Sequence, residues 1–150
     1  LGWNQIEIVV VAPGGTETRL LRLVRRDESA DERSRRLSGE ETSFKEACGS
    51  VTFRVLSKDA NKLSRVPVLL EGRVASISEA ASGATFVELK MSEGGVAGSI
   101  WVCSSQPIDS YAGDVLRVWG EANGQTKTSR QRNYRPRVDL RYYEVLSSPE

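Results

Sequence analysis

The chain has 150 residues, with 21 basic and 20 acidic side chains and no histidine. That length corresponds to one ordinary domain, or to one small domain with an appendage. The missing histidine excludes Ser-His-Asp and Cys-His catalysis, histidine-ligated zinc and a histidine pH switch. No apolar run reaches the roughly 20 residues of a membrane-spanning helix, so membrane insertion is not expected. The sequence therefore predicts a protein that is not an enzyme and that carries no cofactor or metal.

The cysteines and the methionine bear on the cellular context. Cys48 and Cys103 are too few for a disulfide framework or a four-cysteine metal site. We expect both thiols to be reduced, which favours an intracellular over an exported protein. A Cys48–Cys103 bridge would instead indicate an exported module. The single methionine is Met91, so Leu1 is not a translation start, and we expect a piece of a longer parent chain.

Residues 1–64 are expected to form a β-rich N-terminal element. The apolar runs Ile6–Val11 and Leu20–Val24 are separated by Pro13-Gly14-Gly15, which is turn chemistry and predicts a hairpin. Residues 27–42 are highly charged and contain almost no large apolar side chain, so they are expected to form a mobile insert.

Two short elements are expected after this insert. Ser43 with Glu46 three residues later is a weak capping signal, which predicts a short helix near Thr42–Cys48. Val51, Phe53 and Val55 then alternate with polar residues, which predicts a half-buried strand.

Residues 65–150 contain five strand-like runs separated by turn residues, with no long helical pattern between them. Their spacing is typical of a small closed antiparallel barrel with a short C-terminal tail. The runs are Pro67–Ser78, Ala84–Met91, Gly98–Cys103, Asp114–Gly120 and Arg137–Val145.

The order and rhythm of these runs resemble the OB-fold over about Arg65–Leu146. Gly72 lies midway along the first run, where OB barrels bend a long strand, and Ser82-Gly83 supplies a hairpin turn before the second. Gly113–Gly120 resembles the common fourth-strand phrase of the fold. The resemblance implies a five-stranded barrel that binds a ligand on its second and third strands and on the loops joining strands one to two and four to five.

Side-chain alternation divides each strand into an inner and an outer face. The inner residues are expected to be Val68, Leu70, Val74, Val87, Leu89, Met91, Ile100, Val102, Leu116, Val118, Val138 and Leu140. The outer residues are expected to be Arg73, Phe86, Glu88, Lys90, Trp101, Cys103, Arg117, Trp119, Arg137, Asp139, Arg141 and Tyr143. We assign Trp119 a structural role, because the fourth OB strand lies away from the usual binding face.

The connection between the fourth and fifth strands is strongly basic. No acidic side chain lies between Gly124 and Val138, and Asn123-Gly124 is expected to form a tight turn at its start. Outer aromatic rings and arginines are the composition of a single-strand binding surface, where rings stack on bases and cations hold phosphates. The candidate nucleic-acid-binding residues are Arg73, Phe86, Lys90, Trp101, Lys127, Arg130, Arg132, Tyr134, Arg135, Arg137 and Arg141.

Two functions remain open. The first is a module that binds single-stranded DNA or RNA. The alternative is a protein–protein interaction adaptor or scaffold within a larger complex, because Arg, Trp and Tyr are also the enriched residues of protein interfaces. A catalytic carboxylate pair from Glu71, Glu88 and Glu121 is disfavoured, because nothing in the sequence places them at a useful separation.

Overall fold

A computed structural model describes residues 3–11, 17–25, 29–93, 96–127 and 133–149. The chain divides into two compact units, residues 1–40 and 41–150. In the first unit, strand β1 (Trp3–Val11) pairs antiparallel with strand β2 (Glu17–Arg25), which confirms the predicted hairpin. Its Pro13–Gly15 turn lies outside the described residues.

Helix α1 (Ala30–Ala47) occupies most of the predicted insert, so the prediction of a loop with only a short helix is wrong. No residue of α1 is buried, so the sequence of this helix needs no apolar stripe and shows none. Local contacts stabilise the helix instead. The N–H of Ser29 donates to Glu32 Oε2 at 3.0 Å, and the N–H of Glu32 donates to Ser29 Oγ at 3.2 Å, a reciprocal capping box. Two i,i+4 ion pairs follow, Arg36–Glu40 at 2.7 Å and Glu41–Lys45 at 2.6 Å.

The prediction of a strand at Val51–Val55 is also wrong, because a helix begins at Phe53. After the short strand β3 (Gly49–Ser50), helix α2 (Phe53–Asp59) starts at the N-cap Thr52, whose Oγ1 accepts from the N–H of Val55. Phe53 packs against Gly98, where a Cβ would lie 2.1 Å from the phenyl ring. Leu56 is fully buried. Neither helix in the described ranges is long and apolar enough to cross a membrane.

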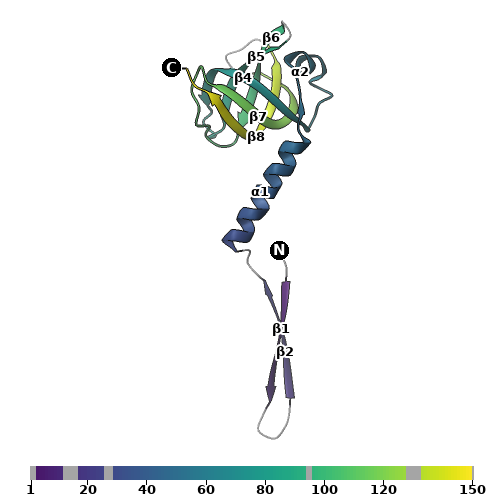
Figure 1. Cartoon of the computed structure of the whole chain (residues 1–150). Helices are drawn as coiled ribbons and strands as arrows, with labels where there is room; N and C mark the ends of the chain where they lie inside the picture. Colours follow the sequence, from purple (N-terminus) through teal and green to yellow (C-terminus); the bar gives the residue numbers. More distant parts are fainter. Residues whose placement is uncertain (1–2, 12–16, 26–28, 94–95, 128–132, 150) are drawn as a thin grey trace. The chain divides into compact units, whose positions relative to one another are not determined.

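The remaining strands form one sheet that closes in a ring, and β3 joins it by pairing in parallel with the first of them (Figure 1). They are β4 (Val66–Glu79), β5 (Thr85–Glu93), β6 (Val96–Ser104), β7 (Val115–Thr126) and β8 (Arg135–Ser147). Their order is β4-β5-β6-β8-β7, and β7 pairs back onto β4. Only β6 and β8 pair in parallel among these five strands. This is the topology of an OB-fold, and the predicted fold class is confirmed.

Strand β4 closes the ring because it changes partners midway. Val66–Arg73 pairs with β7, and Arg73–Glu79 pairs with β5. Gly72 lies at the change. A Cβ on Gly72 would lie 2.6 Å from the carbonyl oxygen of Lys90 and 2.8 Å from Cγ of Leu89. Glycine is therefore required for the close approach of the two strands, as its position in the sequence predicts.

The inner residues predicted from alternation form the core. Leu140 is partly buried against it, and Leu56 and Ala122 complete the buried cluster. Tyr143 was expected on the outer face, and this prediction is wrong because Tyr143 packs against the core. Gly120 pairs with Leu140 and Trp119 with Tyr142, so Arg141 is an extra residue in β8. This bulge reverses the alternation of the residues that follow.

The Asn123-Gly124 turn prediction is wrong as well, because β7 continues to Thr126 and pairs there with Arg135. Gly124 has a φ of 64° at a shift of register between Ala122 and Gln125. The left-handed glycine thus makes a bulge within a long β7–β8 hairpin rather than a turn at its end. The hairpin carries Arg135 to the outer face of β5 and β6.

We expect the Gly72→Ala variant to lose about 1–3 kcal/mol of unfolding free energy, since the new methyl overlaps backbone and side-chain atoms. Chemical denaturation monitored by circular dichroism measures the loss. Gly49→Ala is the matched control, because no atom lies within 4 Å of its Cβ position. Equal stabilities of the two variants would contradict the role assigned to Gly72.

Candidate nucleic-acid interface

The outer side chains of β5, β6 and β8 form one continuous face of the closed sheet. Across β5 and β6, Phe86 lies opposite Cys103 and Glu88 lies opposite Trp101. Across β6 and β8, Trp101 lies opposite Arg137. The register therefore brings together four predicted binding residues, Phe86, Trp101, Arg135 and Arg137, in the place that the OB-fold resemblance implies.

Trp101 lies at the centre of this face but is only 4% exposed. Phe86 contacts it edge-on, with ring centroids 6.5 Å apart. The guanidinium carbon of Arg135 lies 5.8 Å from the indole centroid and covers the ring. The indole Nε1 is buried and has no hydrogen-bond partner in the described part of the chain. Trp101 is thus placed on the outer surface of the sheet but is closed to a ligand in this structure.

The arginines of the face are paired with groups of the same chain. Arg135 forms an ion pair with Glu88, Arg137 with Asp139 at 2.7 Å and Arg141 with Glu121 at 3.2 Å. The Arg73 guanidinium donates to the carbonyl oxygen of Gly113 at 2.9 Å. Residues 125–137 contain no acidic side chain, but Glu88 on β5, Glu121 on β7 and Asp139 on β8 supply the partners. Sequence reasoning missed Glu88 and Glu121 because they lie 47 and 20 positions from the arginines that they pair with.

Two pKa shifts follow from these contacts. Burial raises the pKa of Glu88, but the hydrogen bond and charge of Arg135, with hydrogen bonds from Ser99 and Ser76, outweigh burial and leave it lowered. Burial lowers the pKa of Arg137, but the hydrogen bond to Asp139 and the nearby negative charge outweigh this and leave it raised. Glu88 and Arg137 are therefore charged near neutral pH.

The tip of the β7–β8 hairpin carries further predicted residues. Lys127 Nζ lies 5.0 Å from the ring centroid of Tyr134, a cation–π contact. Tyr134 is 61% exposed, and Lys90 is exposed on β5. Arg130 and Arg132 lie outside the described residues. No cluster of three or more metal-binding side chains occurs among the residues that the structure describes.

A groove of about 330 Å³ lies on this face, next to Phe86, whose ring contacts Trp101. Phe86, Arg137 and Arg141 line it together with Cys103 and Asp139. A second hollow of about 290 Å³ shares Arg141, Asp139 and Glu121 with the groove and adds Arg65 and Asn123. The groove therefore offers one aromatic ring and two arginines, each arginine already held by a carboxylate.

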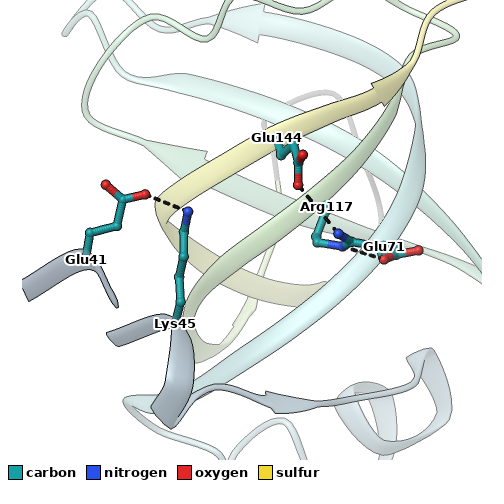
Figure 2. A network of polar contacts seen from close by, with 5 residues as sticks. All are labelled: Glu41, Lys45, Glu71, Arg117 and Glu144. Atoms are coloured by element: carbon teal, nitrogen blue, oxygen red, sulfur yellow. Dashed lines mark hydrogen bonds and ion pairs between the residues drawn. The ribbon is translucent and has the colours of Figure 1, made fainter. Parts of the chain in front are cut away.

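The other tryptophan of the closed sheet has different surroundings. Lys45 Nζ lies 4.4 Å from the centroid of Trp119 and 5.6 Å from that of Tyr142, and Phe44 contacts Tyr142. Lys45 also forms an ion pair with Glu41 (Figure 2). Arg117, on the same strand as Trp119, forms ion pairs with Glu71 and Glu144. The last turn of α1 thus covers Trp119, in agreement with its expected structural role.

No protein-family model matches the chain, and no curated protein matches it. Solved structures with similar folds are known. An aspartyl-tRNA synthetase from Entamoeba histolytica is 9% identical, with a TM-score of 0.49 over 69% of this chain and 22% of its own. A mitochondrial single-stranded DNA binding protein from S. cerevisiae is 8% identical, with a TM-score of 0.43 over 57% of this chain and 99% of its own. An OBody bound to hen egg-white lysozyme is 15% identical, with a TM-score of 0.47 over 63% of this chain and 93% of its own. The chain thus spans about a fifth of the synthetase.

Both cysteines are free thiols. Burial raises the pKa of Cys103 to about 11, so only about one thiol in a thousand is ionised at pH 8. We expect native Cys103 to react slowly with iodoacetamide at pH 8 and faster as the pH approaches 11, whereas unfolded chain reacts quickly. Mass spectrometry of the peptides separates it from Cys48. Rapid labelling of native Cys103 at pH 8 would contradict its burial.

Proposed function

We propose that the chain is a non-catalytic OB-fold module that binds single-stranded nucleic acid. One observation carries the proposal: an open groove on the outer face of β5, β6 and β8 is lined by Phe86, Arg137 and Arg141. A strand needs a ring on which a base can stack and cations for the adjacent phosphates, and the groove offers both within one continuous surface.

The residues take separate roles in this proposal. Phe86 and Tyr134 stack on bases, while Arg137 and Arg141 hold phosphates in the groove. Lys127 and Lys90 extend the cationic path along the hairpin tip and β5. Arg73 on β4 is proposed to flank this path. Arg130 and Arg132, which lie outside the described residues, stay predicted binding residues.

The carboxylates set the strength of binding. A phosphate in the groove competes with Asp139 for Arg137 and with Glu121 for Arg141. The binding free energy from each arginine is therefore only the difference between its interaction with the phosphate and its interaction with the carboxylate. The affinity for a strand then depends on several weak contacts. Binding of this kind weakens steeply as salt rises, because every phosphate contact releases counterions.

A protein-binding adaptor is the second candidate. The internal pairing of Arg135, Arg137 and Arg141 favours it, since a charge-balanced surface with an aromatic centre is also suited to a protein partner. Such a module would bind an oligonucleotide no better when salt is lowered.

The test is fluorescence anisotropy with a labelled oligothymidine of about 20 nucleotides, between about 20 and 200 mM salt. We expect the Arg137→Ala, Arg141→Ala double variant to lose about tenfold in affinity and to reduce the salt slope by 1 to 2, roughly one per lost phosphate contact.

Arg117→Ala is the matched control, because Arg117 is also ion-paired on the sheet surface but lies outside the groove. It should retain the affinity of the unsubstituted chain. Failure of the unsubstituted chain to bind the oligonucleotide at low salt would rule out the nucleic-acid proposal and favour the adaptor.

A further inference from the structure

We propose that Trp101 is a second stacking position, closed in the free protein because Glu88 holds Arg135 over the indole ring. This inference rests on the proposed function, since the strand bound in the groove is the ligand that opens the position. Glu88 then acts as a positioning residue that regulates access to the ring.

The geometry of three neighbouring side chains carries the inference. Glu88 and Trp101 are direct cross-strand partners on β5 and β6. Arg135 comes from the start of β8, pairs with Glu88 and lies 5.8 Å from the indole centroid. The carboxylate thus fixes the guanidinium above the ring, and Phe86 closes one edge.

The cover is held by contacts that a ligand can replace. The side chains of Arg135 and Glu88 are 29% and 18% exposed, so water reaches both charges and weakens their attraction. Beneath them, the indole N–H is buried without an acceptor in the described residues, which disfavours the closed state. A group that offers Arg135 an anion and Trp101 a flat face would favour the open state.

A nucleotide unit has both properties. Its phosphate takes the place of Glu88 on Arg135, and the guanidinium moves off the ring. The base then occupies the face that the guanidinium has left, and the N–H of Trp101 becomes accessible to an acceptor. A free phosphate supplies only the first half of this exchange, so the site should distinguish a strand from an inorganic anion.

Quenching of Trp101 fluorescence by acrylamide tests the closed state. The full chain carries Trp3→Phe and Trp119→Phe so that Trp101 is the remaining indole. Without oligonucleotide, Glu88→Gln and Arg135→Ala should each raise the quenching constant at least about twofold, because either change removes the cover. Glu71→Gln is the control, since Glu71 pairs with Arg117 on other strands and should leave Trp101 protected.

The same protein tests the opening. Oligothymidine should change Trp101 emission on binding, and inorganic phosphate at matched ionic strength should not. Glu88→Gln should raise oligothymidine affinity about threefold, and Glu71→Gln should not.

Unchanged quenching in both Glu88→Gln and Arg135→Ala would overturn the inference. Binding of oligothymidine without any response of Trp101 would also overturn it, while leaving the proposed function standing. A chain that fails to bind at low salt in the anisotropy assay instead removes the proposed function, and with it the strand as the opening ligand.

Discussion

The change of partner within strand β4 is the constraint on which the closed sheet depends. One strand can pair with β7 at its start and β5 at its end only if the chain bends sharply, and at Gly72 the backbone of β5 leaves no room for a Cβ. Closure in turn places β6 beside β8, a pairing that brings Trp101 opposite Arg137. The candidate interface therefore exists because a distant glycine allows the ring to close.

Charge balance, rather than charge excess, distinguishes this interface. Glu88, Asp139 and Glu121 each hold an arginine of the outer face. These pairs order long side chains that would otherwise move freely, and they let one face contain several arginines without strong mutual repulsion. The arrangement suits a surface whose cations are positioned in advance and are released to an incoming anion one at a time.

The sequence predicts the five sheet strands and their inner faces well, because alternation and turn residues act locally. Sequence patterns predict neither the full length of α1 nor the presence of α2, because neither helix shows a clear apolar stripe. Helix α1 has no apolar stripe and depends on a capping box, and α2 has too few residues for its i, i+3 spacing of Phe53 and Leu56 to stand out. The pairing of Arg135 with Glu88 could not be predicted, since it requires the register of strands far apart in the chain. Whether the residues of the predicted site bind nucleic acid stays a prediction.

The bulge at Arg141 makes the order of faces in β8 depend on the exact number of residues. Removal of one residue there would turn Tyr143 out of the core, and it would point Tyr142 inward, away from Phe44 and Lys45. Substitutions on the outer face change one contact each, but a single deletion would exchange two surfaces at once. We therefore expect this strand to tolerate a change of residue type far better than a change of length.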